Sequence, residues 1–186
     1  MNLPNKLVVF RIALIPFFLF FFLRAVPGES MFRVIALVIF LLAAITDYWD
    51  GYFARKWGMV TSFGKLMDPL ADKMLVASAL VALAARQELS AWVVVIVLCR
   101  EFLVTGLRQL AIENGSGIIS ASIWGKLKTV IQMTMISCLV AGMGVPGLFG
   151  QFGFIVAQVL IYATVIITVF SAIDYVRDYK KAGAGT

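Results

Sequence analysis

Six long apolar segments constrain the fold of this chain more than any other feature of its sequence. Each is about as long as the roughly 20 residues that a helix needs to cross a lipid bilayer. The segments lie near residues 7–26, 31–54, 69–86, 90–111, 122–143 and 152–175. We therefore predict an all-α integral membrane protein with six transmembrane helices.

The amino-acid composition supports one membrane domain and excludes a soluble one. Of the 186 residues, 62% are hydrophobic and 14% are charged. Soluble domains have roughly 45–50% apolar residues and about 25% charged residues. Six spans use most of the chain, so no soluble domain fits beside them. We predict a single transmembrane catalytic domain over residues 1–179, followed by a short flexible cytoplasmic tail over residues 180–186.

The absence of histidine and the positions of the two cysteines exclude several kinds of chemistry. The sequence contains no histidine, which excludes histidine general bases, Ser-His triads and histidine-ligated metals. Both cysteines, Cys99 and Cys138, lie within apolar segments, so we expect neither a disulfide framework nor a thiolate metal site. Any acid–base or metal chemistry therefore depends on carboxylates.

The basic residues are distributed unevenly between the two sides of the predicted bundle. Of the 16 Lys and Arg residues, only Arg24, Arg33 and Arg86 fall beside the odd-numbered connections. Because cytoplasmic loops carry an excess of Lys and Arg, we predict a multi-pass protein of the cell membrane. Both termini and the active site then face the cytoplasm. The net charge of +6 reflects these loops and contact with anionic membrane lipids, not binding to nucleic acid.

Four of the 10 acidic residues flank the predicted connection between the second and third spans. Asp47 and Asp50 are three positions apart, and Asp68 and Asp72 are four apart, so each pair shares one helix face. A rise of about 1.5 Å per residue from Met31 places the first pair just inside the cytoplasmic face, where the third span begins. The four carboxylates are therefore expected to meet at one depth.

A structural alternative explains only one of these aspartates. Asp68 precedes Pro69, which is the pattern of a helix N-cap followed by proline at the first helical position. Asp72 is left unexplained, and Asp47 and Asp50 lie near a helix C-terminus, where the helix dipole disfavours anions. Clustered carboxylates instead favour hard cations such as Mg²⁺, Mn²⁺ or Ca²⁺. Four of them suit two ions that assist phosphoryl transfer.

The aspartates belong to a longer pattern that resembles the signature of the CDP-alcohol phosphotransferase family. The pattern is Asp47-x2-Asp50-Gly51-x2-Ala54-Arg55-x8-Gly64-x3-Asp68-x3-Asp72. The resemblance implies a six-helix membrane enzyme that moves a phosphatidyl or similar group from a CDP-linked donor to an alcohol and releases CMP. It implies that the four aspartates hold two divalent cations, Mg²⁺ or Mn²⁺, and that Asp72 is also the general base. It assigns the nucleotide pocket to Asn5, Gly51, Ala54, Arg55 and Gly64.

Other segments extend this resemblance over most of the chain. Residues 4–11 resemble the segment that opens the family's first helix, except that Val8 stands where many members have threonine. Residues 100–108 and 125–129 most resemble members that use CDP-diacylglycerol and glycerol 3-phosphate. The family resemblance also implies a homodimer.

Four basic residues indicate where a phosphate-bearing acceptor binds. They project at the cytoplasmic ends of the fourth and fifth spans, and their surplus of positive charge suits an anionic substrate. They are Arg100, Arg108, Lys126 and Lys128. Two alternatives stay open: these residues anchor the helices at the membrane surface, or Arg100 pairs with its neighbour Glu101.

The resemblance leads to one functional hypothesis with two competitors. We predict transfer of the phosphatidyl group of CDP-diacylglycerol to glycerol 3-phosphate, giving phosphatidylglycerol phosphate and CMP, by metal-assisted in-line attack with an Asp base. One competitor is a related phosphatidyltransferase that uses inositol phosphate, serine or phosphatidylglycerol as acceptor. The other is a divalent-cation transporter, for which acidic residues are expected at mid-membrane and on both approaches.

Overall fold

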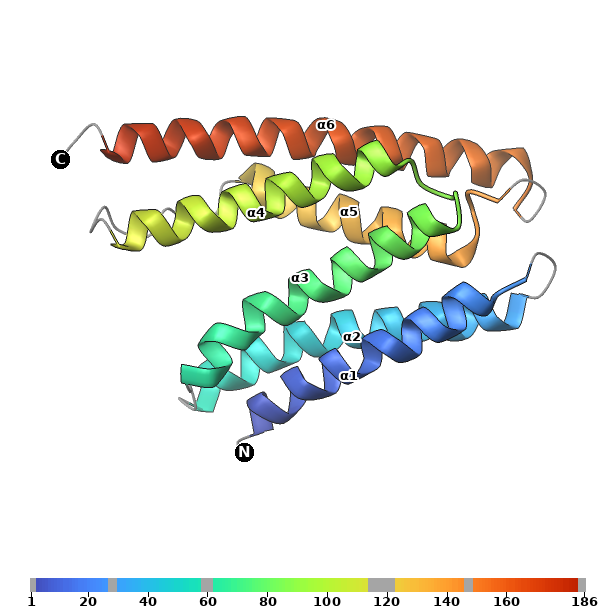
Figure 1. Ribbon diagram of the computed structural model, residues 1–186, viewed down its shortest axis with the longest axis horizontal. Helices are drawn as coiled ribbons and strands as arrows, with labels where there is room; N and C mark the ends of the chain where they lie inside the picture. Colours follow the sequence, from blue (N-terminus) through green and yellow to red (C-terminus); the bar gives the residue numbers. More distant parts are fainter. Residues whose placement is uncertain (1–2, 27–29, 58–61, 114–122, 146–148, 184–186) are drawn as a thin grey trace.

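The computed structural model contains six helices and no strand in the parts of the chain that it describes (Figure 1). It describes residues 3–26, 30–57, 62–113, 123–145 and 149–183, without the side chains of residues 3–7, 30, 47–57, 62–69, 72, 112–113 and 180–183. The helices are α1 (Leu3–Arg24), α2 (Ser30–Trp57), α3 (Ser62–Ala85), α4 (Ala91–Glu113), α5 (Ile123–Ala141) and α6 (Gly150–Gly183). The predicted all-α fold class is confirmed.

Some helices extend beyond the apolar segments from which they were predicted. Helix α3 begins at Ser62 and not near residue 69, and α6 continues to Gly183, into the segment predicted as a tail. An apolar segment marks only the part of a helix with apolar side chains, whereas the backbone hydrogen bonds continue through polar residues. The alternative interpretation of Asp68 as an N-cap is wrong, because this residue lies inside α3.

One described segment is long and apolar enough to cross a membrane by its length and composition. It is Gly150–Tyr179 in α6, whose mean hydropathy reaches 2.3. Two further apolar segments of the described chain, Met31–Thr46 in α2 and Lys73–Ala85 in α3, are shorter. The number of helices that cross a membrane stays a prediction.

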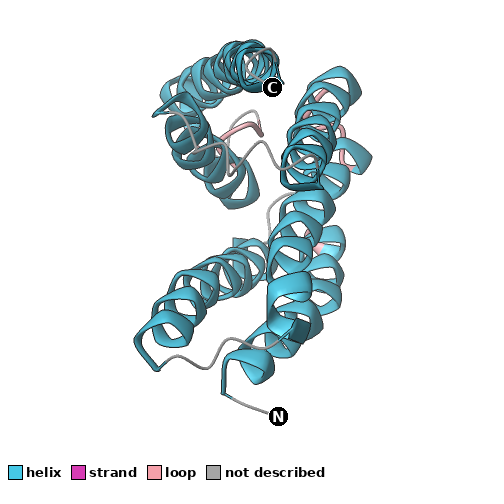
Figure 2. Ribbon diagram, turned by 90° about the vertical axis from the view of Figure 1, so that its left-hand side faces the viewer, coloured by secondary structure: helices cyan, strands magenta, loops and turns pink. Residues whose placement is uncertain are grey.

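Successive helices run in opposite directions along the bundle (Figure 1). We call one end the terminal end, because α1 begins and α6 ends there, together with the end of α2 and the start of α3. The opposite end is the distal end. Helix α1 packs on α2 and α3, α6 packs on α4 and α5, and α5 also contacts α2 and α3. Figure 2 views this arrangement from the terminal end.

A buried apolar cluster joins the helices. Phe18 stacks on Phe22 with 5.6 Å between ring centroids, and its centroid lies 5.8 Å from that of Phe40. Leu80 from α3 and Leu139 from α5 are completely buried in the same cluster. These residues lie in the halves of their helices that are nearer the distal end. The described core therefore stabilises mainly the distal half of the bundle.

Two helices close at the distal end with a left-handed residue. Gly142 follows α5 with φ 99°, and Gln87 follows the last turn of α3 with φ 59°. The amide of Glu88 donates to the carbonyl oxygen of Leu83 at 3.0 Å, as in a Schellman motif. The left-handed conformation is ordinary for glycine but rare for glutamine. At Gln87 it turns the chain sharply just before Glu88.

Arg33, Arg86 and Glu88 form what we call the distal cluster. Both arginines donate to the Glu88 carboxylate, with 2.8 Å between Arg86 Nε and Glu88 Oε1. Arg33 also donates to two carbonyl oxygens at the end of α5, each at 3.3 Å. Arg86 donates to two at the end of α1, at 3.1 and 2.7 Å. A cation at a helix C-terminus pairs with carbonyls that have no partner inside the helix, so the cluster ties several helices together.

Candidate functional site

The predicted metal ligands lie on two neighbouring helices at the terminal end. Asp47 and Asp50 are in the last part of α2, and Asp68 and Asp72 are in the first half of α3. The end of α2 and the start of α3 lie close together in Figure 1, and the two helices are in contact. The four side chains lie outside the described residues. A set made only of carboxylates suits Mg²⁺ or Mn²⁺, and the backbone brings its two halves to one end of the bundle.

The predicted nucleotide-binding residues lie on the same helix ends. They are Asn5 in α1, Gly51, Ala54 and Arg55 in α2, and Gly64 in α3. Their side chains also lie outside the described residues, so their roles stay predictions. Val8, one turn after the predicted asparagine, is completely buried. The position at which many family members have threonine therefore packs here as part of the apolar interior.

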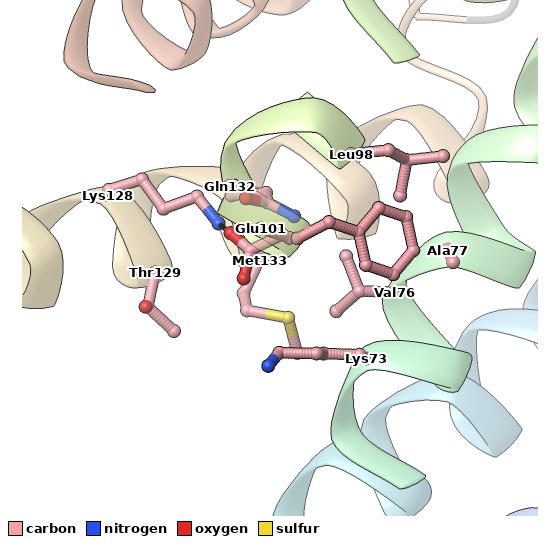
Figure 3. Close-up of a pocket in the computed structure, with 10 residues that line it drawn as sticks. Lys73, Val76, Ala77, Leu98, Glu101, Lys128, Thr129, Gln132 and Met133 are labelled. Carbon is pink, nitrogen blue, oxygen red and sulfur yellow. Dashed lines mark hydrogen bonds and ion pairs between the residues drawn. The ribbon is translucent and has the colours of Figure 1, made fainter. Parts of the chain in front are cut away.

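A small cavity of about 50 Å³ lies between α3, α4 and α5, and we call it the inner cavity (Figure 3). Its polar lining comes from all three helices, and apolar side chains complete the wall. The lining includes Lys73, Leu98, Glu101, Lys128, Gln132 and Met133. Lys73 directly follows the predicted general base along α3. One residue of the cavity wall is therefore the neighbour, along the chain, of the predicted catalytic residue.

Glu101 is the centre of the polar contacts in the inner cavity. Its carboxylate accepts a hydrogen bond from Lys128 and another from Arg100 Nη1 at 3.2 Å. Its backbone oxygen accepts one from Thr105 Oγ1 at 2.6 Å, and this hydroxyl in turn accepts one from Lys73. The alternative pairing of Arg100 with Glu101 is thus confirmed. One carboxylate shared by two cations compensates only part of their charge.

A second cavity of about 200 Å³ lies between α4, α5 and α6, and we call it the basic cavity. It is lined by Arg100, Arg108, Gly125, Lys126, Thr129 and Tyr175, with Val104. Arg108 Nε donates to the Tyr175 hydroxyl at 3.3 Å, and its guanidinium lies 5.9 Å from the centroid of that ring. Arg100 also donates to Ser171. Ser171 and Tyr175 both belong to α6, so this helix orients the two arginines of α4.

The two cavities share Thr129, and basic side chains outnumber carboxylates among their described lining residues. Their lining residues include five basic side chains and one carboxylate, that of Glu101. Arg108 and Lys126 are exposed, so a ligand can reach them from outside. This arrangement favours a small anion that carries a phosphate group, because guanidinium and ammonium groups form charge-assisted hydrogen bonds with phosphate oxygens.

The structure brings the four predicted acceptor-binding residues into one region but divides them between the two cavities. Arg100, Arg108 and Lys126 line the basic cavity, whereas Lys128 lines the inner cavity. Sequence reasoning missed the contribution of α6, although a signal exists. Four polar residues follow one face of this apolar helix at steps of three or four positions. They are Thr164, Thr168, Ser171 and Tyr175.

Comparisons with known proteins agree with the site's chemistry. A family model described as CDP-alcohol phosphatidyltransferase matches residues 1–170. Three similar proteins are each named CDP-diacylglycerol–glycerol-3-phosphate 3-phosphatidyltransferase. The one from Bacillus subtilis is 39% identical over 183 residues, covering 94% of this chain and 93% of the relative. Those from Rickettsia bellii and Haemophilus influenzae are both 36% identical, covering 97% and 96% of this chain and 96% and 94% of their own lengths.

Proposed function

The chain belongs to the CDP-alcohol phosphatidyltransferase family, and we propose that it transfers the phosphatidyl group of CDP-diacylglycerol to glycerol 3-phosphate. The products are phosphatidylglycerol phosphate and CMP, so the enzyme acts in phospholipid biosynthesis. Relatives named for this reaction match nearly the whole chain. The structural observation that carries the proposal is the pair of adjoining cavities, whose described lining residues include five basic side chains and one carboxylate.

The charge of these cavities discriminates between the possible acceptors. Glycerol carries no anionic group and would leave Arg108 and Lys126 without an anionic partner. Serine brings a carboxylate with a single charge together with an ammonium group, which the basic side chains of the described lining repel. Phosphatidylglycerol carries its phosphate between the acyl chains and the headgroup glycerol, and the names of the relatives favour glycerol 3-phosphate over it. Inositol phosphate shares the phosphate, and the names of the relatives favour glycerol 3-phosphate over it. Transport of a divalent cation does not require a cavity that binds phosphate, so the basic cavity favours the transferase over the transporter.

The family signature supplies the catalytic roles. Asp47, Asp50, Asp68 and Asp72 would hold two divalent cations, Mg²⁺ or Mn²⁺, which when bound offset the negative charge of the transferring phosphoryl group. Asp72 takes the proton of the acceptor's primary hydroxyl as its oxygen attacks the lipid-side phosphorus. The bond from that phosphorus to CMP breaks, and CMP leaves. Arg108 holds the acceptor's phosphate away from this centre.

The nucleotide end of the donor fits the remaining signature residues. Gly51 and Gly64 have no side chain, so a ligand can approach the backbone closely at these positions. Arg55 lies one helical turn beyond Gly51 and would pair with a phosphate oxygen of the donor. Ala54 and Asn5 complete the pocket proposed for the cytidine group.

We also propose that all six helices cross the cell membrane, with both termini and the active site on the cytoplasmic side, and that the enzyme is a homodimer. The clustering of Arg33 and Arg86 at the distal end, far from the basic cavities, supports this orientation. Single cysteines at Gly28 or Gly147, in a variant without Cys99 and Cys138, should react from the outer side. Labelling only from the cytoplasmic side would contradict the orientation, and a monomer in native mass measurements would contradict the dimer.

The direct test is release of CMP by the purified protein with CDP-diacylglycerol and a panel of acceptors. We expect rapid release with glycerol 3-phosphate and little with glycerol, serine, inositol phosphate or phosphatidylglycerol. Preference for another member of the panel would show a different acceptor specificity. No CMP release with any acceptor, together with uptake of Mn²⁺ by vesicles that contain the protein, would support the transporter.

A further inference from the structure

Gln132 carries a buried polar atom whose role the proposed reaction does not yet explain. Its side chain lines the inner cavity, and the residue is 2% exposed. Within the described part of the chain, its Oε1 accepts no hydrogen bond. Buried polar atoms in native proteins are nearly always hydrogen-bonded. An unpaired amide oxygen on a residue that lines a cavity therefore points to a contact with a ligand that enters the cavity.

The neighbours of Gln132 restrict what this ligand group is. Lys128 donates to Glu101 (Figure 3). Lys73 donates to Thr105, so both lysines of the lining have hydrogen-bond partners other than the amide. An amide oxygen accepts hydrogen bonds and repels anions, which excludes a phosphate oxygen. Lys73 and Lys128 already place two ammonium groups in the described lining, which disfavours a third. A neutral donor, a hydroxyl group, fits these conditions.

The size and position of the inner cavity restrict the ligand further. A volume of about 50 Å³ has room for roughly three to five water-sized groups, which is too little for a nucleotide or an acyl chain. Leu98 and Met133 provide apolar walls beside the polar groups. The cavity adjoins the basic cavity at Thr129, and its wall includes Lys73, the residue after Asp72. It thus lies between the proposed phosphate-binding residues and the helix that carries the proposed base.

We propose that Gln132 is a specificity-determining residue whose amide oxygen accepts a hydrogen bond from the secondary hydroxyl of glycerol 3-phosphate. This inference rests on the proposed function. The phosphate of the acceptor pairs with the basic cavity, and its primary hydroxyl reacts. The secondary hydroxyl lies between them and needs an acceptor of its own. Gln132 provides that acceptor, selects an acceptor with a hydroxyl at this carbon and orients the primary hydroxyl.

The test compares glycerol 3-phosphate with 3-hydroxypropyl phosphate, which keeps the primary hydroxyl and the phosphate but lacks the secondary hydroxyl. We expect wild-type kcat/KM to be higher for glycerol 3-phosphate by about 10-fold or more, because the analogue leaves the amide oxygen unpaired. In Gln132→Leu the preference should fall to about 1, because neither acceptor can then pair with an amide oxygen at this position. Gln151→Leu, an exposed position on α6, is the matched control and should keep the wild-type preference.

The outcomes separate this inference from the proposed function. If Gln132→Leu keeps the full preference, or if the wild type does not distinguish the two acceptors, the role of Gln132 is overturned while the reaction stands. If the wild type releases no CMP with glycerol 3-phosphate, the proposed function itself fails. Should Gln132→Leu not fold, Gln132→Met removes the same amide with a flexible side chain of similar volume, and the same comparison applies.

Discussion

The two ends of the bundle use the same residue types for different purposes. In the distal cluster, Arg33 and Arg86 direct their donors to one carboxylate and to carbonyl oxygens at helix ends. Around the cavities nearer the terminal end, Arg100 and Lys128 share the carboxylate of Glu101, and further cations line an open space. The arginines of the distal cluster pair with acceptors of the protein itself. Around the cavities, the described lining residues include five basic side chains and one carboxylate.

This difference shows how a buried cation with a structural role differs from one that binds a ligand. A charge removed from water needs partners, because desolvation otherwise costs several kcal/mol. Arg33 finds its partners in Glu88 and the end of α5. Arg108 is exposed, so water can solvate its charge until a ligand binds, and among the described residues it contacts a tyrosine hydroxyl and ring. Burial together with the number of protein partners, and not the residue type, separates the two roles.

The largest expected effect concerns the terminal end alone. Asp47→Asn, Asp50→Asn and Asp68→Asn should each reduce CMP release to background, because a neutral amide binds a divalent cation far more weakly than a carboxylate. The distal core is untouched, so the thermal midpoint in detergent should stay within a few degrees of that of the wild type. Activity should also disappear with excess chelator and return with Mg²⁺ or Mn²⁺. Substantial turnover in excess chelator contradicts the metal proposal.

Removal of the distal carboxylate should instead affect stability. Glu88→Ala leaves two arginines without their shared partner, and breaking a buried ion pair lowers the free energy of unfolding by about 3–5 kcal/mol. Glu88→Gln keeps a hydrogen-bond acceptor and should lose less. Denaturation in detergent measures both values, while the KM for glycerol 3-phosphate of the folded protein should not change. If Glu88→Ala lowers the free energy of unfolding by less than about 1 kcal/mol, or raises the KM for glycerol 3-phosphate, the proposed difference between the two ends is contradicted.

A smaller and more selective effect is expected at the basic cavity. Each charge-assisted contact to phosphate is worth about 1.5–3 kcal/mol, so Arg108→Ala should raise the KM for glycerol 3-phosphate by about 10- to 150-fold. The KM for CDP-diacylglycerol should stay nearly constant. Arg24→Ala removes an exposed arginine at the distal end and is the matched control. Equal changes in both KM values for Arg108→Ala would assign this residue to membrane anchoring.

Much of the fold was predictable because it depends on local properties of the chain. Apolar length alone located all six helices, and Gly142 marks the end of α5 through its left-handed conformation. The start of α3 at Ser62 was missed, because its first residues are polar and carry no apolar signal. The contact between Arg33 and Glu88 joins residues 55 positions apart, and no spacing rule reports such a pair.

The candidate site was predictable to a different degree in each part. The Arg100–Glu101 pair was considered because the two residues are neighbours in sequence. Gln132 was missed because a single amide on an apolar helix has no pattern, and only its burial beside a cavity reveals its position. The metal-binding role of the four aspartates was predicted from their clustering and from the family signature, and the base role of Asp72 from the signature alone. Both stay predictions because those side chains lie outside the described residues.

The central claim is that the surplus charge of the basic cavity recognises the acceptor's phosphate. It is tested most directly by kcat/KM for glycerol 3-phosphate and for glycerol, measured in the wild type and in the Arg108→Ala Lys126→Ala double variant. The account predicts that the wild type prefers glycerol 3-phosphate by at least about 100-fold, and that the double variant loses most of this preference while its low activity with glycerol hardly changes. An undiminished preference in the double variant would contradict the account.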